Sequence, residues 1–248
     1  MEVLGIDVGG SGIKGAIVNT ETGAFKGERF RLPTPEKAKP EAVGDVISEL
    51  VAHFSYKGIV GVGFPSVVIG GVVHTAANIS ENWLKLNAAE LIKKKTGCPA
   101  IMINDADAAG VAEMKFGAGR EFTSHGVVLM LTLGTGIGSA IFTNGVLLPN
   151  TEFGHMKIRG KDAEHRSSDA VRQIKELSWK SWAKRLQEVI SAYEALLWPD
   201  LIIVGGGVSK ESKRFLPMIK TRAKIVPAEL LNQAGIVGAA VFASQQTG

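Results

Sequence analysis

Cysteine is nearly absent from this chain, which contains a single cysteine, Cys98, among 248 residues. One cysteine can form no intramolecular disulfide and supplies no cysteine-rich metal centre, so a reducing environment is expected. The sequence also lacks an apolar run of roughly 18–20 residues, the length that crosses a bilayer, and a signal-peptide pattern. We therefore expect a cytoplasmic protein with no membrane partner.

Signals for nucleic-acid binding are missing as well. There is neither a zinc-finger spacing nor a basic stripe with interleaved aromatic residues, and aromatic residues make up 6% of the chain. No P-loop motif occurs, and the glycine-rich residues 134–138 lead into the strand-like residues 140–142, whereas a Rossmann loop must open a helix. The net charge of +4 favours anionic partners, but without these motifs we expect no binding to nucleic acid.

What the sequence does contain is a glycine-rich segment that occurs twice. A shift of 124 residues, half of the chain, places residues 10–17 over residues 134–141 with five identities and a Ser/Thr exchange. Glycine lets backbone N–H groups come close to an anion, and a repeat at half the chain length predicts a duplicated two-domain enzyme that grips a phosphate chain. Two ordinary glycine-rich hairpins are the alternative. The shift sets Leu131 against Asp7 and Gly138 against Lys14, so we expect the charged groups in the first copy only.

Hydrophobic periodicity predicts an α/β protein. Strands are expected at residues 3–8, 13–18, 28–32, 58–63, 100–103, 126–133, 140–142 and 200–204, and helices at residues 42–54, 88–96, 106–116 and 234–244, with a helical region from 168 to 197. In that region the apolar stripe that includes Trp179 and Trp182 is interpreted as core. The small, apolar helix at 234–244 is expected to pack on the first domain and to act as a hinge.

Polar residues follow several of these strands, at the strand ends where open α/β sheets place ligands. Asp105 stands between the strand at 100–103 and the next helix, where a carboxylate can serve as a general base or as a helix N-cap; the residues alone leave both roles open. Ser66 comes after Pro65, which ends a strand. The polar loop at 149–155 breaks all periodicity, as functional loops often do.

Five motifs, taken together and in order along nearly the whole chain, resemble the ROK group of sugar kinases. They lie at residues 7–14, 104–109, 133–138, 152–155 and 205–209. Within that group, residues 63–66, 75–78, 149–152, 162–164, 227–232 and 234–240 are most similar to the polyphosphate glucokinases. The resemblance implies a duplicated actin/hexokinase-like (ribonuclease H-like) α/β fold, with two lobes that close a central cleft over the sugar. It predicts a smaller lobe of residues 1–105 plus 234–248 and a larger lobe of residues 106–233.

The resemblance also implies an activity and its residues. The expected reaction is phosphoryl transfer to the 6-hydroxyl of glucose with inorganic polyphosphate as donor and ATP as the alternative; mannose as a second acceptor and a homodimer are left open. Asp105 would be the general base, and Asp7 would hold Mg²⁺ directly or through water. The sugar would contact Ser66, Asn78, Asn104, Asp105, Glu152, His155 and Glu164. The donor would contact Gly9, Gly10, Ser11, Lys14, Gly134, Thr135, Gly136, Gly205, Gly206 and Gly207.

The sequence departs from the family pattern at one point. Many ROK proteins carry a cysteine-rich zinc motif where residues 160–170 contain no cysteine, so no structural zinc is expected.

Three other functions remain as alternatives: a strictly ATP-dependent glucokinase, a sugar-sensing ROK regulator and a sugar-independent polyphosphate or ATP hydrolase. A regulator would carry a helix-turn-helix before the first strand, which here is expected from residue 3. A hydrolase would not require the predicted sugar-binding residues.

Overall fold

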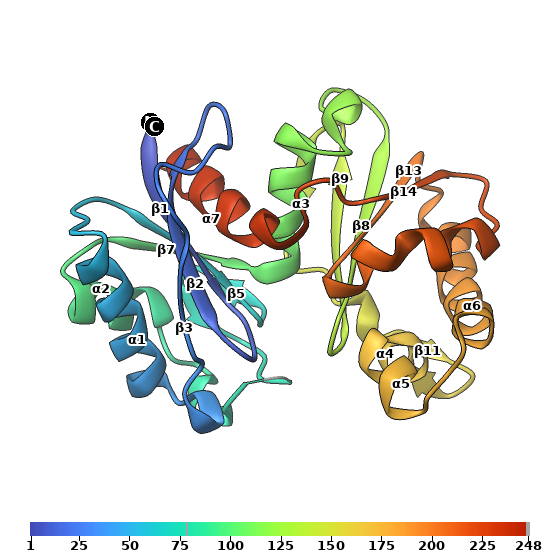
Figure 1. Cartoon of the computed structure of the whole chain (residues 1–248), viewed down its shortest axis with the longest axis horizontal. Helices are drawn as coiled ribbons and strands as arrows, with labels where there is room; N and C mark the ends of the chain where they lie inside the picture. The colour runs from blue at the N-terminus through green and yellow to red at the C-terminus, as the bar shows by residue number, and fades with distance from the viewer. Residues whose placement is uncertain (78, 247–248) are drawn as a thin grey trace. The chain divides into compact units, whose positions relative to one another are not determined.

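The computed structural model describes residues 1–77 and 79–246, which form two compact units (Figure 1). Unit 1 comprises Met1–Ala112 and the C-terminal residues from Gln233, and unit 2 comprises Glu113–Asn232. The sequence placed the first boundary at residue 105, whereas the structure keeps residues 106–112 with unit 1, where the backbone of Ala108 lies directly against Gly238 of the C-terminal helix. Unit 1 is thereby the slightly longer of the two.

Unit 1 is built on a five-stranded sheet in the order β3-β2-β1-β4-β7. The strands are β1 Glu2–Val8, β2 Ile13–Asn19, β3 Phe30–Leu32, β4 Val60–Phe64 and β7 Ala100–Asn104, with the small hairpin β5 Val68–Ile69 and β6 Val72–Val73. The helices are α1 Pro40–His53, α2 Ala88–Thr96, α3 Asp105–Phe116 and α7 Ala234–Gln245, with 3-10 turns at Glu36–Ala38 and Glu81–Trp83. Strands β1, β4 and β7 are parallel, so their C-terminal ends meet at one edge of the sheet.

The two faces of this sheet differ in side-chain size, which decides what covers them. Leu4 and Ile6 belong to the core cluster that includes Ile47 of α1. On the other face, a Cβ atom at Gly5 or Gly61 would collide with the backbone of α7. The glycines therefore let α7 lie directly on the sheet, opposite α1 and α2 (Figure 1). The predicted packing of the C-terminal helix on the first domain is confirmed, and its role as a hinge stays a prediction.

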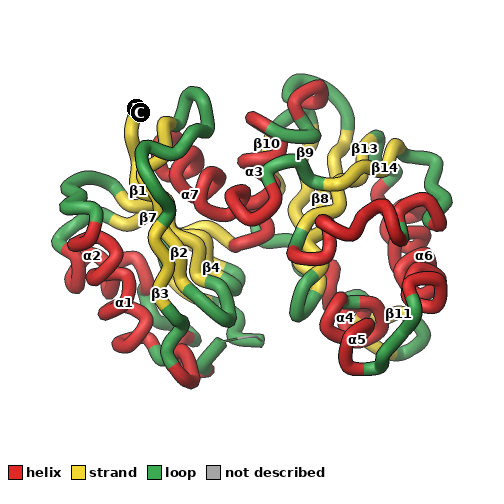
Figure 2. Tube along the Cα trace, viewed as in Figure 1, coloured by secondary structure: helices red, strands yellow, loops and turns green. Residues whose placement is uncertain are grey.

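Unit 2 repeats the same topology, with the sheet order β10-β9-β8-β13-β14 (Figure 2). The strands are β8 Val127–Leu133, β9 Ile137–Thr143, β10 Val146–Leu148, β13 Leu201–Gly205 and β14 Lys224–Pro227, with the small hairpin β11 Lys157–Ile158 and β12 Lys161–Asp162. The helices are α4 Ala163–Ser167, α5 Asp169–Ile174 and α6 Trp179–Leu197, with 3-10 turns at Arg120–Phe122, Phe153–His155, Gly207–Arg214, Leu216–Met218 and Leu231–Gln233. In both sheets an antiparallel three-strand meander is followed by two parallel strands, as a duplication predicts.

Helix α6 supplies the core of unit 2. Its residues Trp182, Leu186 and Ile190 are fully buried, as expected for the apolar stripe, whereas Trp179 is half-buried and the guanidinium groups of Arg172 and Arg214 lie over its ring. Among the helices of residues 1–77 and 79–246, none is long and apolar enough to cross a membrane.

The two glycine hairpins are equivalent but not identical. Strands β2 and β9 are related by the predicted shift of 124 residues, yet β1 ends at Val8 and β8 at Leu133, so the second loop is one residue shorter. The register pairs Asp7 with Lys14 in the first hairpin and Thr132 with Gly138 in the second. The counterpart of Asp7 is therefore Thr132; the ungapped prediction of Leu131 is wrong because it ignores the shorter loop. Thr132 and Gly138, the counterparts of Asp7 and Lys14, are both uncharged, as expected.

Candidate active site

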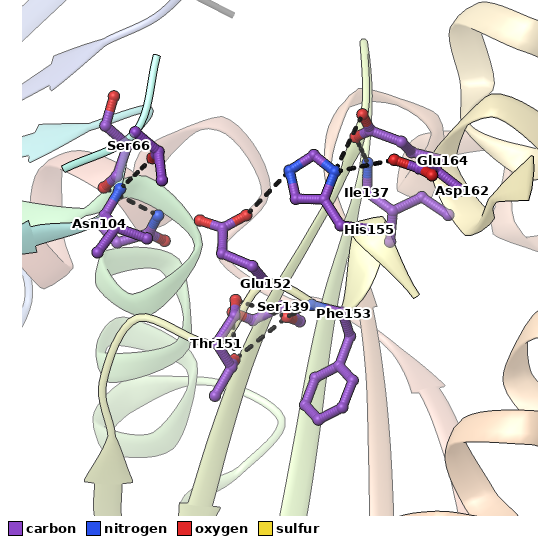
Figure 3. A network of polar contacts seen from close by, with 12 residues as sticks. Ser66, Asn104, Ile137, Ser139, Thr151, Glu152, Phe153, His155, Asp162 and Glu164 are labelled. Atoms are coloured by element: carbon purple, nitrogen blue, oxygen red, sulfur yellow. Dashed lines mark hydrogen bonds and ion pairs between the residues drawn. The ribbon is translucent and has the colours of Figure 1, made fainter. Parts of the chain in front are cut away.

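Asn104 organises the polar groups at the C-terminal edge of the first sheet (Figure 3). It ends β7, its side chain is buried, and its Oδ1 accepts hydrogen bonds from the backbone N–H groups of Ala106 and Asp107 at 2.9 and 3.2 Å. Its Nδ2 donates to the carbonyl oxygen of Ser66 at 3.2 Å. Asn104 thus caps α3 and ties the start of that helix to the segment that follows β4.

Asp105 is the first residue of α3 and is half-buried. Its Oδ1 accepts a hydrogen bond from the N–H of Ala106 at 2.8 Å. Asn104 occupies the N-cap position, so the cap of α3 does not depend on Asp105. A carboxylate in the first turn also interacts favourably with the positive end of the helix dipole.

Ser66 is almost completely buried, with 2% of its surface exposed. Within the described part of the chain its hydroxyl oxygen has no hydrogen-bond partner. A buried hydroxyl without a partner costs about 1–3 kcal/mol, so the group is well placed to gain from a bound ligand. Asn78, the other sugar residue predicted for this region, lies outside the described residues.

The glycine hairpin of unit 1 holds its loop with backbone and side-chain contacts. Gly9 N donates to the carbonyl of Gly12 at 3.1 Å. The Thr34 hydroxyl donates to the carbonyl of Gly9, and the Arg31 guanidinium donates to the carbonyl of Ser11, both at 2.5 Å. These two carbonyl oxygens are therefore engaged by β3 and the segment after it.

Asp7 and Lys14 face each other across the hairpin. The Lys14 Nζ lies 3.3 Å from Asp7 Oδ2, and both side chains are about one-fifth exposed, at 23% and 19%. A Cβ atom added to Gly235, in the first turn of α7, would lie 3.0 Å from the Asp7 Cγ, so the carboxylate is packed against that helix end. A single acidic side chain suits Mg²⁺, which in phosphoryl-transfer sites is held by one or two carboxylates and completes its shell with water and substrate phosphates. No cluster of three or more metal-binding side chains occurs among residues 1–77 and 79–246.

In unit 2 a set of hydrogen bonds fixes the polar loop at 149–155 against β9 (Figure 3). The Ser139 hydroxyl donates to the Thr151 carbonyl at 2.8 Å and accepts from the backbone N–H of Phe153 at 3.1 Å. The Tyr193 hydroxyl donates to the Phe153 carbonyl at 2.7 Å, and burial raises the pKa of Tyr193, which keeps this donor protonated. Glu152 is held between the two anchored residues, Thr151 and Phe153.

His155 joins three acidic side chains into one network (Figure 3). Its Nδ1 lies 3.2 Å from Asp162 Oδ2 and 3.9 Å from Glu164 Oε1, and its Nε2 lies 3.8 Å from Glu152 Oε2. Glu164 is oriented by the backbone N–H of Ile137, which donates to its Oε2 at 3.3 Å. The structure therefore brings together Glu152, His155 and Glu164, all predicted from the sequence, and adds Asp162, which was quoted only as part of a motif.

The carboxyl groups of Glu152 and Asp162 in this network have pKa values shifted in opposite directions. Burial raises the pKa of Glu152, and the charge of Glu164 raises it further, while His155 lowers it. Hydrogen bonds from Lys157 and His155 lower the pKa of Asp162, so Asp162 stays ionised and can orient the imidazole through Nδ1. Carboxylates and an imidazole in this arrangement can bind neighbouring hydroxyl groups and discriminate against ligands that lack one.

Two glycine-rich segments meet at the C-terminal ends of β8 and β13. In the loop after β8, Gly134 N donates to the Gly136 carbonyl at 3.1 Å, and Ala170 N donates to the Gly134 carbonyl at 3.0 Å. Gly206 has φ +81° and lies against the backbone of Leu133, where any Cβ would collide. The predicted donor residues 134–136 and 205–207 are thus neighbours within unit 2.

Comparison with known proteins identifies this architecture. The sequence model of the ROK family matches residues 3–167. Polyphosphate glucokinase of Mycobacterium tuberculosis (strain CDC 1551 / Oshkosh) is 48% identical over 98% of this chain and 92% of its own. The crystal structure of the inorganic polyphosphate/ATP-glucomannokinase from Arthrobacter sp. strain KM has a TM-score of 0.95 at 46% identity, covering 99% of both chains. A ROK family glucokinase from Streptomyces griseus, in complex with glucose and AMPPNP, has a TM-score of 0.85 at 25% identity, covering 99% of this chain and all of the other. The predicted family and fold are confirmed.

Proposed function

The chain belongs to the ROK family, and we propose that it is a glucokinase that transfers a phosphoryl group from inorganic polyphosphate to the 6-hydroxyl of glucose. The observation that carries this proposal is the likeness, over nearly the full chain, to two enzymes named for polyphosphate. The network of Glu152, His155 and Glu164 supports the sugar as acceptor, because these predicted sugar residues form one connected set of hydroxyl-binding groups.

Asp105 is the proposed general base. Its carboxylate would accept the proton of the 6-hydroxyl while the sugar oxygen forms a bond to phosphorus and the bond from phosphorus to the bridging oxygen of the donor breaks. Asn104 and the unpaired hydroxyl of Ser66, near the start of α3, would orient the sugar in unit 1. Asn78 is proposed for the same task from the family motif.

The two glycine loops are proposed to bind the donor. Their backbone N–H groups suit phosphate oxygens, with Lys14 on the first hairpin and the exposed Thr135 on the second as additional ligands. Lys14 is paired with Asp7, so it would divide its charge between that carboxylate and the phosphate. The segment of Gly205, Gly206 and Gly207 is proposed as the adenosine site when ATP is the donor.

Kinases of this type need a divalent metal ion, and we propose that Asp7 holds Mg²⁺, directly or through water. The ion would neutralise charge on the donor phosphates. Asp7 is suited to this task because it ends β1 beside the glycine loop and because α7 supports its carboxylate from behind.

Substituting Gly235 by alanine tests this placement of Asp7. The new methyl group would press on the Asp7 carboxylate, and we expect kcat to fall about ten- to a hundredfold, as misplaced catalytic groups cause. Stability should change by less than about 1 kcal/mol, because the better helix propensity of alanine, roughly 1 kcal/mol, offsets the strain of the 3.0 Å contact with the Asp7 Cγ. Gly44→Ala in α1 is the matched control, since the nearest atoms to its Cβ would belong to the side chains of Lys95, at 3.4 Å, and Leu91, at 3.8 Å. An unchanged kcat in Gly235→Ala would contradict the role of Asp7.

The choice of donor is tested by comparing kcat/KM for glucose phosphorylation with purified polyphosphate and with ATP. We expect polyphosphate to be preferred, as the names of the relatives suggest. A preference for ATP would assign the chain to the ATP-dependent glucokinases and leave the family intact. Release of inorganic phosphate at the same rate without glucose would instead favour a hydrolase, and an absence of any phosphoryl transfer would favour a sugar sensor.

A further inference from the structure

A cavity of about 400 Å³ adjoins the glycine hairpin within unit 1. Its walls come from the hairpin, from the segment after β3, from the residue that follows β4 and from residues 77, 79 and 80, and the described lining residues are Val8, Gly9, Gly10, Thr34, Pro35, Lys37, Ala38, Pro65, Ala77, Ile79 and Ser80. This volume is in the range of small-molecule sites. The cavity therefore shares a wall with the proposed donor site, and Lys37 is the cation that lines it.

The segment that carries Lys37 is strained. Lys37 has φ +61° and Ala38 has φ +41°, both in the left-handed region that residues with a side chain rarely adopt. Such conformations cost of order 1–3 kcal/mol each and persist only where the surroundings enforce them. Here the fully buried Trp83 donates from its ring nitrogen to the Ala38 carbonyl at 2.8 Å, and Ala38 N donates to the Pro35 carbonyl at 2.9 Å. A core residue thus holds Lys37 at the cavity.

The charge of Lys37 is not engaged by the protein. Its side chain is exposed and makes no hydrogen bond or ion pair in the part of the chain that the structure describes. The two neighbouring cations differ in this respect, because Lys14 is paired with Asp7 and Arg31 binds the carbonyl of Ser11. Among the described residues that line this cavity, Lys37 is therefore the cation that is available to an anion.

We propose that this cavity receives phosphate units of polyphosphate behind the transferred phosphoryl group, and that Lys37 is their counter-charge. The inference rests on the proposed function and adds a specificity residue to it. The glycine segment proposed for adenosine, at Gly205, belongs to unit 2, whereas the described residues that line the cavity all belong to unit 1. Polyphosphate has no adenosine and continues as a chain of anions, so it is the donor that gains from a second cationic subsite.

Four variants test the inference. Lys37→Gly removes the side chain and suits the left-handed backbone, and Lys37→Gln removes the charge but keeps the length. Lys37→Arg retains the charge, and Lys39→Ala is the matched control, because Lys39 is an exposed lysine two residues away that does not line the cavity. For each variant, kcat and KM are measured for polyphosphate, ATP and glucose.

We expect KM for polyphosphate to rise about tenfold in Lys37→Gly and Lys37→Gln, as loss of one charge-assisted contact predicts, and to return towards wild type in Lys37→Arg. KM for ATP and for glucose should change less than about twofold, and Lys39→Ala should behave as wild type. An unchanged KM for polyphosphate, an equal rise for ATP, or a rise confined to glucose would overturn the inference while the wild-type activity stands. Wild-type protein that phosphorylates no glucose with polyphosphate would instead overturn the proposed function itself.

Discussion

Replacing Asp105 by asparagine is expected to lower kcat by about 10²–10⁴-fold, the usual contribution of a general base. Asparagine has the same shape as aspartate but cannot accept the proton of the sugar hydroxyl. The fold should survive the change, because the side chain of Asn104, and not that of Asp105, caps α3 through Ala106 and Asp107. Loss of activity with intact folding would separate catalysis from a structural role.

The measurement is single-turnover and steady-state formation of glucose 6-phosphate, combined with calorimetric titration of glucose. We expect glucose affinity to stay within a few-fold of wild type, since the neighbouring polar groups are unchanged. Asp45→Asn serves as the control: it alters an exposed carboxylate in the same unit that pairs only with Lys95. Retention of more than about a tenth of the wild-type kcat in Asp105→Asn would exclude the general-base role.

The sequence could predict the position of Asp105 at the end of a strand, but not its role. Its position after a buried strand was readable from the hydrophobic pattern, but aspartate is favoured both as a helix cap and as a base, so composition could not choose between these roles. The side-chain contacts of Asn104 assign the cap. The catalytic reading then stands on the position of Asp105 in the first turn and on the family motif.

The network around His155 includes a residue that the sequence did not predict. Glu152, His155 and Glu164 were predicted from motifs, while Asp162 was not, although it makes the shortest contact to the imidazole, at 3.2 Å. That contact depends on the tight hairpin of β11 and β12, two strands of two residues each, which are too short to show any periodicity. The spacing of Asp162 and Glu164, on either side of the start of α4, was the available signal.

The repeated hairpin was the most informative sequence feature, and its limits are physical too. An ungapped shift located both loops and the matching second strands, but a one-residue difference in loop length moved the partner of Asp7 from Leu131 to Thr132. Only the register of the strands reveals such a slip. At equivalent positions the first hairpin carries the charged side chains of Asp7 and Lys14, whereas the second offers the hydroxyl of Thr132 and backbone groups.

Glu113 carries the largest expected effect on stability, and nothing in the sequence pointed to it. This residue of α3 is fully buried, and its carboxylate accepts hydrogen bonds from three backbone N–H groups: Ala118 at 2.9 Å, Glu229 at 3.1 Å and Leu230 at 2.7 Å. A Cβ at Gly117 would collide with the carboxylate, so a glycine is needed beside it. The chain enters unit 2 at Glu113 and leaves it shortly after Leu230, so one side chain fastens both connections.

Glu113→Ala is expected to lower the free energy of unfolding by about 3–6 kcal/mol, because three N–H groups lose their partner at about 1–3 kcal/mol each, towards the lower end of that range since they are only partly buried. Glu113→Gln should lose about 1–3 kcal/mol, since its one amide oxygen can replace Oε2, which serves Ala118 and Glu229, but not Oε1, which serves Leu230. Urea denaturation measures both, with the exposed Glu121→Ala as a control that should stay within about 0.5 kcal/mol of wild type. If Glu113→Ala were no less stable than Glu113→Gln, the three N–H groups would have found other partners, and the carboxylate would not be what holds the two connections together.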